Sequence, residues 1–299
     1  MKLVHYHVPG QGGTWGLAED DSVYPLATDA GSGGAFLASL LQWPDPVRLL
    51  TETFDTLRGG AAVSLVELSA AAAHPGVAHL LPPIDQQEVW AAGVTYLRSK
   101  VARMEESEGA ARFYDLVYDA ERPELFLKAT PSRVSGQNGP VRIRTDARWN
   151  VPEPEVGLLL TPAMKCVGYT VGNDMSSRDI EGENPLYLPQ AKVYRDCCAL
   201  GPVIWLEPEA PEHRELEIHL AIERGNELVF SGETSTAQMK RKFAELAGWL
   251  GKDNHFPQGA VLLTGTGLVP SDEFTLQPGD VVAISVPQIG TLMNTVVQG

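Results

Sequence analysis

Two glutamates stand two residues apart in the run Asn150–Glu155, which reads Asn-Val-Pro-Glu-Pro-Glu. On an extended chain, which the prolines favour, residues two apart project to the same side, so Glu153 and Glu155 should point together. Facing carboxylates repel each other unless they share a cation or one of them binds a proton. Oxygen ligands alone suit a hard cation such as Mg²⁺, Ca²⁺ or Mn²⁺. The alternative to a metal site is a solvated strand face.

A second group of polar residues follows an apolar run. The segment Val171–Asp179 reads VGNDMSSRD, and Asp174 lies where a predicted strand ends, a common place for a ligand group. An Asx turn is the alternative for Asp174. Lys192 follows shortly afterwards in Gln190-Ala191-Lys192. Beside an acidic metal centre this lysine could act as acid, base or substrate clamp, whereas a lone lysine elsewhere is a surface charge.

A third candidate is the run Thr264–Gly267, which reads TGTG and follows the apolar residues Val261–Leu263. Its glycines let the backbone approach a ligand, and its hydroxyls and amides could hold a carboxylate or phosphate. An ordinary turn is the alternative, because the run is neither GxGxxG nor a P-loop. The chain has no GxSxG and no HExxH. Glu124 is a further isolated acid at the start of a strand-like run.

The composition limits the possible partners. The chain has 299 residues, and its 38 acidic against 23 basic residues give a formal net charge of −15. A broad nucleic-acid surface is excluded and docking on anionic membranes is disfavoured, since both need clustered positive charge. We expect no membrane span and no signal peptide, because the chain has no long apolar stretch and no apolar core at its N-terminus. Three cysteines without a disulfide framework also favour a cytoplasmic protein.

The elements that must position these residues are mostly strands. We expect a β-rich α+β fold, with a small N-terminal domain at 1–84 and a catalytic domain at 85–299, separated near the proline-rich run Leu80–Ile84. A charged helix is expected at Arg98–Glu108, and an amphipathic helix from a capping box at Ser235 to Gly251. The predicted strands of the second domain are Val89–Val94, Glu124–Ala129, Val141–Arg144, Val156–Leu160, Val167–Val171, Pro202–Leu206, Glu217–Ile222, Glu227–Phe230, Val261–Thr264, Phe274–Leu276 and Val281–Val286.

Several motifs in one order resemble the fumarylacetoacetate hydrolase superfamily, over about residue 88 to the C-terminus. Within it the chain is most similar to the 2-keto-3-deoxy-D-arabinonate dehydratase branch. The motifs are RPELFLKAT (Arg122–Thr130), WNVPEPE (Trp149–Glu155), GYTVGNDMSSRD (Gly168–Asp179), QAKVYRDCCALGP (Gln190–Pro202), TGTG and QPGDVVAISVPQIGTLMNTV (Gln277–Val296).

The resemblance implies a mixed β-roll or sandwich catalytic domain, a homodimer or homotetramer, and one divalent cation, Mg²⁺ before Ca²⁺ or Mn²⁺. It makes Glu153, Glu155 and Asp174 the metal ligands, and Glu124 and Lys192 the catalytic residues, with the choice of base between those two left open. The expected substrate contacts are Thr266, Ser99 and Gln190.

The activity implied by the resemblance is dehydration of a small anionic 2-oxo acid, 2-keto-3-deoxy-D-arabinonate, to 2,5-dioxopentanoate and water. Hydrolytic members place a histidine where this chain has Ser99, and a serine has no basic nitrogen that could activate water near neutral pH. A metal-dependent hydrolase of C–C bonds in acylpyruvates or fumarylacetoacetate-like diketo acids is the first alternative. A non-catalytic binder of 2-oxo acids or metal is the second.

Overall fold

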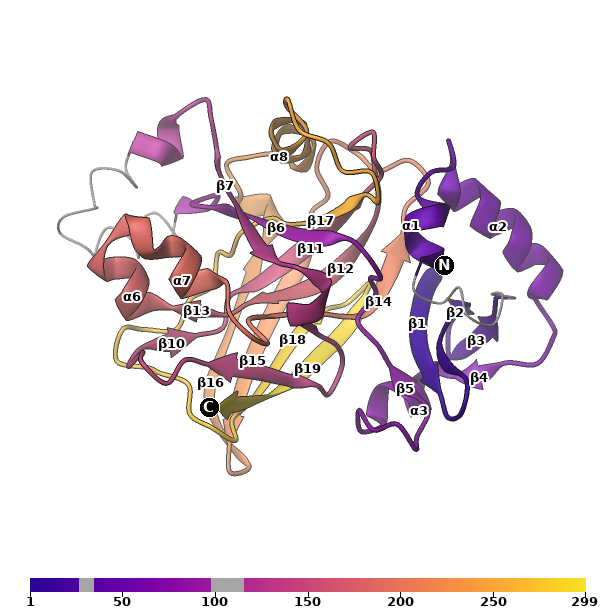
Figure 1. Cartoon of the computed structure of the whole chain (residues 1–299), viewed down its shortest axis with the longest axis horizontal. Helices are drawn as coiled ribbons and strands as arrows, with labels where there is room; N and C mark the ends of the chain where they lie inside the picture. The colour runs from indigo at the N-terminus through magenta and orange to yellow at the C-terminus, as the bar shows by residue number, and fades with distance from the viewer. Residues whose placement is uncertain (27–34, 98–115) are drawn as a thin grey trace.

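Strands dominate the computed structural model, which describes residues 1–26, 35–97 and 116–299 (Figure 1). The described strands form a twelve-stranded, a five-stranded and a two-stranded sheet. The strand-rich, mixed architecture confirms the predicted fold class. No helix among the described residues is long and apolar enough to cross a membrane.

The largest sheet carries Glu124, Glu155 and Asp174 and has the order β4-β3-β2-β1-β14-β12-β11-β17-β6-β7, with β5 beside β1 and β8 beside β14. Its strands are β1 (Lys2–Val8), β2 (Gly12–Glu19), β3 (Ser22–Pro25), β4 (Val63–Ser64), β5 (His79–Leu80), β6 (Glu88–Gly93), β7 (Glu124–Ala129), β8 (Val134–Ser135), β11 (Pro154–Leu160), β12 (Cys166–Asp174), β14 (Cys198–Leu206) and β17 (Ala260–Leu263). Most neighbours are antiparallel, but β17 runs parallel to β6.

The five-stranded sheet has the order β16-β15-β18-β19-β9, and β10 pairs with β13 alone. These strands are β9 (Pro140–Ile143), β10 (Asn150–Val151), β13 (Ser176–Ser177), β15 (Glu217–Arg224), β16 (Glu227–Ser235), β18 (Val281–Val286) and β19 (Gly290–Gln298). The described helices are α1 (Phe36–Leu40), α2 (Pro46–Leu57), α3 (Leu65–Ala70), α6 (Arg178–Glu183), α7 (Leu188–Lys192) and α8 (Phe243–Leu250), with 3₁₀ turns η1 (Pro131–Arg133), η2 (Pro185–Tyr187) and η3 (Thr236–Gln238).

The central strand β11 is buried along its whole length because both of its faces pack against a core. Its residues Val156 and Leu158 join a cluster with Ile284 of the five-stranded sheet. Leu159 joins a second cluster, which includes Leu50 of α2. Burial on both faces explains why the strand reads as a continuous apolar run. The carboxylates at one end of this strand are therefore placed deep in the protein.

The N-terminal strands continue the large sheet. Strand β1 pairs antiparallel with β14, with Leu3 opposite Ile204, while α1 and α2 lie over this part of the molecule (Figure 1). The run Leu80–Ile84 contributes to the fold, because Leu80 pairs with Tyr6 and the Leu81 amide donates to the His5 carbonyl. The division into domains at 1–84 and 85–299 remains our proposal.

Two predicted elements differ in the structure, and one lies outside it. The helix expected from Ser235 is shorter, because Ser235 caps only η3 and Met239 is extended in an isolated bridge with Tyr96. Helix α8 begins at Phe243 and ends at Leu250, with the predicted Gly251 as its C-cap. The segment Phe274–Leu276 is not a strand. The charged helix expected at Arg98–Glu108 lies outside the described residues.

Candidate metal centre and active site

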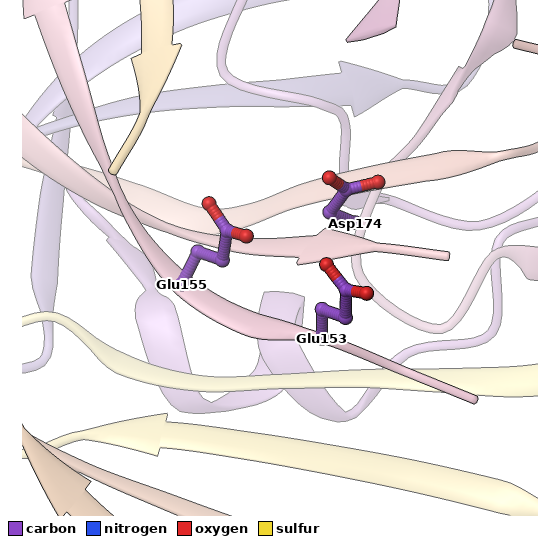
Figure 2. A group of neighbouring side chains, drawn as sticks. All are labelled: Glu153, Glu155 and Asp174. Carbon is purple, nitrogen blue, oxygen red and sulfur yellow. The ribbon is translucent and has the colours of Figure 1, made fainter. Parts of the chain in front are cut away.

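Three carboxylates, those of Glu153, Glu155 and Asp174, face one another at one end of β11 and β12 (Figure 2). One oxygen of each lies within 4.8 Å of the others. All three side chains are buried, with exposed fractions of 3%, 1% and 1% respectively. The structure thus brings together the three residues that the resemblance assigned to a metal.

Strand register explains how the acids meet. The amide of Asp174 donates to the carbonyl of Glu153 at 3.0 Å, so these residues lie directly opposite each other. Glu155 lies two pairs further along, opposite Gly172. Pro154 fits between the glutamates because β17 pairs with β11 only from Gly157 onward, so its missing N–H costs no bond to β17.

Three buried cations surround the acids. The Nζ atom of Lys192 lies 2.7 Å from Oε2 of Glu153 and 3.3 Å from Oδ2 of Asp174. Lys128 contacts the other oxygen, Oδ1, of Asp174 at 2.6 Å. Arg178 contacts Oε1 of Glu153 at 3.0 Å. Three cationic and three anionic side chains cancel formally, so a bound divalent cation would leave the centre positive toward an anionic substrate.

The environment of Glu155 favours a proton or a cation on its carboxylate. Burial raises the pKa of Glu155 well above its ordinary value of 4.5, and the negative charges of Asp174 and Glu153 raise it further. Lys192 and the amide of Gly265, which donates to Oε2 at 2.6 Å, act in the opposite direction. Three buried oxygen donors that repel one another fit a hard divalent ion, and Mg²⁺ prefers such carboxylate ligands.

A small pocket opens beside this centre. Its walls are Ala92, Gly93, Val94, Phe126, Glu153, Glu155, Asp174, Arg178, Gly265 and Thr266. The Nζ of Lys192 lies over the ring of Phe126, 5.7 Å from its centre. Glu124 precedes Phe126 by two positions on β7, and alternation along the strand therefore turns both toward the same side. Glu124 is half-buried and lies over Gly93.

The residues expected to contact the substrate do not all line the pocket. Thr266 lines the pocket, and its hydroxyl donates to the carbonyl of Leu268 at 3.0 Å. The side chain of Gln190 is exposed on α7 and is not part of the pocket wall. Ser99 lies outside the described residues. The contacts of these three residues with a substrate remain predictions.

Two residues with no role predicted from the sequence, Lys128 and Arg178, lie at the centre. Arg178 begins α6 and lines the pocket, although its exposed fraction is only 1%. Lys128 has no exposed surface, and its ammonium also donates to the carbonyls of Met175 and Lys192, both at 2.7 Å. The position of Lys128 inside the apolar run ELFLKA could have indicated that this lysine is buried. No sequence pattern distinguishes Arg178 from a surface arginine.

Comparisons with known proteins agree with this geometry. The family model for the fumarylacetoacetate (FAA) hydrolase C-terminal region matches residues 88–297. A probable 2-keto-3-deoxyxylonate dehydratase of Haloferax volcanii is 50% identical over 218 residues, which cover 73% of this chain and 75% of that protein. A 2-dehydro-3-deoxy-D-arabinonate dehydratase of Saccharolobus solfataricus is 42% identical over 217 residues, 72% of this chain and 73% of that protein.

A solved structure resembles the whole chain. It is a 2-keto-3-deoxy-D-arabinonate dehydratase complexed with magnesium and 2,5-dioxopentanoate, with a TM-score of 0.81 and 33% identity over 100% of this chain and 99% of that one. The apo form of such a dehydratase also gives a TM-score of 0.81. The matched family model, these relatives and the buried carboxylate centre show that the chain belongs to the fumarylacetoacetate hydrolase family.

Proposed function

We propose that this protein is a magnesium-dependent dehydratase that converts 2-keto-3-deoxy-D-arabinonate to 2,5-dioxopentanoate and water. The observation that carries the proposal is the buried centre of Glu153, Glu155 and Asp174, whose charges are balanced by buried cations that include Arg178 and Lys192. Similarity to the two dehydratases, and to a structure that holds magnesium and 2,5-dioxopentanoate, supports both the reaction and the substrate.

Glu153, Glu155 and Asp174 would hold the cation. When bound, Mg²⁺ supplies a Lewis acid that stabilises negative charge on the carboxylate and keto oxygens of a 2-oxo acid. The guanidinium of Arg178 lines the same pocket and can bind the anionic end of the substrate. Thr266 is a second candidate for that end.

Glu124 and Lys192 divide the proton transfers in this proposal. Lys192 donates hydrogen bonds to Glu153 and Asp174, and in this proposal it acts as the proton donor. Glu124 is the carboxylate on the pocket side of β7 and takes the proton from C3. Lys192 stabilises the developing enolate and protonates the hydroxyl that leaves C4.

These steps break the C3–H and C4–O bonds, form a C3–C4 double bond and release one water. The resulting enone keeps its C5 oxygen. Tautomerisation moves hydrogen from C5 and its hydroxyl to C4 and C3, which gives the aldehyde of 2,5-dioxopentanoate. The atoms therefore balance with the loss of a single water and with no other reactant.

A substrate panel tests the proposal. The purified protein is incubated with several 2-keto-3-deoxy acids and, in parallel, with acylpyruvates, each with Mg²⁺ and with EDTA. We expect Mg²⁺-dependent loss of water from the five-carbon keto-deoxy acid and no cleavage of acylpyruvates. Cleavage of acylpyruvates without dehydration would establish the C–C hydrolase instead, and turnover of neither class would favour a binder. A homodimer or homotetramer and a cytoplasmic location remain predictions.

A further inference from the structure

We infer that Gly93 is a positioning residue, whose missing side chain provides the space in which the carboxylate of Glu124 lies beside the pocket. The inference rests on the role proposed above for Glu124 and adds a second residue to it. Gly93 ends β6 and Glu124 begins β7, and the two residues pair directly in the antiparallel ladder.

Cross-strand geometry places the two residues on the same face. Directly opposed residues of an antiparallel pair carry their β-carbons on one side, about 4.5–5.5 Å apart. A β-carbon built on Gly93 would overlap Oε2 of Glu124 and would lie 2.6 Å from its Cδ and 3.2 Å from its Cγ. The Glu124 side chain therefore lies across the α-carbon of Gly93, a position that any other residue at 93 would occupy with its own atoms.

The backbone around Gly93 is held in place. A side chain added at position 93 would therefore displace the Glu124 side chain and not the strand. Val94 follows with a φ of 52°, which is unusual for a β-branched residue. The next residue is held by two bonds: the Thr95 hydroxyl donates to the Thr264 carbonyl at 2.8 Å, and the Lys240 amide donates to the Thr95 carbonyl at 3.0 Å. A methyl group at position 93 would meet the far end of a flexible side chain, which yields before this turn does.

Alanine is compatible with the backbone at this position. Gly93 lies outside the left-handed region of φ, so the glycine is not needed for its conformation. The structure thus assigns the requirement for glycine to the Glu124 carboxylate. Because Gly93 also lines the pocket, a displaced carboxylate would lose its place relative to a bound substrate.

The test compares Gly93→Ala, Glu124→Gln and the double variant. A misplacement of about 1 Å can cost roughly a hundredfold in rate, so we expect Gly93→Ala to lower turnover of the keto-deoxy acid by about that factor. The double variant should be no slower than Glu124→Gln alone, because the methyl group acts only through Glu124. The thermal midpoint and the Mg²⁺-induced stabilisation of Gly93→Ala should match those of the wild type.

Gly251→Ala is the matched control. A β-carbon at Gly251 would press on another flexible side chain, that of Met164, 3.0 Å from its Sδ, but at the end of α8 and outside the pocket wall. This variant should retain full turnover. Equal turnover in Gly93→Ala and the wild type, or losses that multiply in the double variant, would overturn the inference.

A crystal structure of Gly93→Ala provides a readout that needs no substrate. We expect the carboxylate of Glu124 to have left position 93 while β6 and the three acids remain in place. A carboxylate that stays where it is would refute the positioning role even if the protein proved to have another activity. A wild type that dehydrates none of the keto-deoxy acids would refute the proposed function, and the crystal structure would still decide the role of Gly93.

Discussion

The ammonium of Lys128 lies 2.6 Å from Oδ1 of Asp174, in a place where neither side chain has more than 1% of its surface exposed. Burial is the largest single influence and lowers the pKa of Lys128, but the charge and hydrogen bond of Asp174, together with Cys197 and Cys198, raise it above its ordinary value. Lys128 is therefore a permanent cation that leaves the second oxygen of Asp174 to face Lys192 and Glu153. The carboxylate of Asp174 thus contacts the structural Lys128 through one oxygen and faces the candidate active site with the other.

Removal of this lysine should destabilise the protein. Lys128→Met keeps the length of the side chain but leaves Asp174 and two carbonyls without their ammonium partner. Breaking a buried ion pair costs about 3–5 kcal/mol, and we expect a loss of that size in the free energy of unfolding measured in urea without Mg²⁺. Lys165→Met, at an exposed lysine, should change it by less than about 0.5 kcal/mol. A loss below about 1 kcal/mol in Lys128→Met would contradict the structural role.

Stabilisation by Mg²⁺ should increase with pH. Because burial raises the folded-state pKa of Glu155, metal-free protein gains stability from the protonated acid at low pH. It loses that stability as pH rises from the ordinary value of 4.5 through the raised pKa, and Mg²⁺ requires the deprotonated form. The rise in thermal midpoint on adding saturating Mg²⁺ should therefore grow across this range. Glu155→Gln should lose most of the rise in thermal midpoint on adding Mg²⁺. A rise in the wild type that is independent of pH would argue against Glu155 as a metal ligand.

Exchange of the C3 proton in deuterated buffer separates the roles of Glu124 and Lys192. A general base contributes about 10²–10⁴-fold, so Glu124→Gln should lose most C3 exchange along with turnover while its thermal response to Mg²⁺ is retained. Lys192→Met should lose dehydration more completely than exchange. Wild-type exchange in Glu124→Gln together with none in Lys192→Met would transfer the role of base to the lysine.

Arg178 should affect substrate affinity more than metal binding. Its guanidinium lines the pocket and is fixed against Glu153, and a lysine cannot reproduce its forked geometry. A lost charged hydrogen bond is worth about 1.5–3 kcal/mol, which predicts a KM for the keto acid about ten- to a hundredfold higher in Arg178→Lys. The exposed Arg48→Lys serves as the control. An unchanged KM would remove Arg178 from the substrate site.

The three acids of the site could be predicted from the sequence because each stands in a recognisable local pattern. Glu153 and Glu155 stand two apart on an extended segment, and Asp174 ends a strand, so period-two geometry and the resemblance were sufficient. Lys128 and Arg178 could not be placed in this way. Their partners lie on other elements, and a register shift between Val89 and Trp90 interrupts the β6–β7 ladder opposite Lys128.

The predicted helices and strands differ in the same way. Elements that depend on local sequence were predicted correctly, and elements altered by contacts with distant residues were not. Glu124–Ala129 and Val281–Val286 have the predicted bounds because their composition alone favours strands. The helix expected from Ser235 begins late because Met239 pairs with Tyr96, a contact that no local pattern reveals. Phe274–Leu276 has strand-like residues, but the Leu276 amide makes a single bond to the Asn150 carbonyl and no ladder forms.

The most direct test of the central claim is an NMR measurement on 2-keto-3-deoxy-D-arabinonate with protein first treated with EDTA and then supplied with Mg²⁺. We expect no reaction before Mg²⁺ is added. Afterwards the C5 aldehyde of 2,5-dioxopentanoate should appear, and Glu155→Gln should abolish it. Formation of the aldehyde at an equal rate in EDTA, or a stable substrate signal with Mg²⁺ present, would contradict the account.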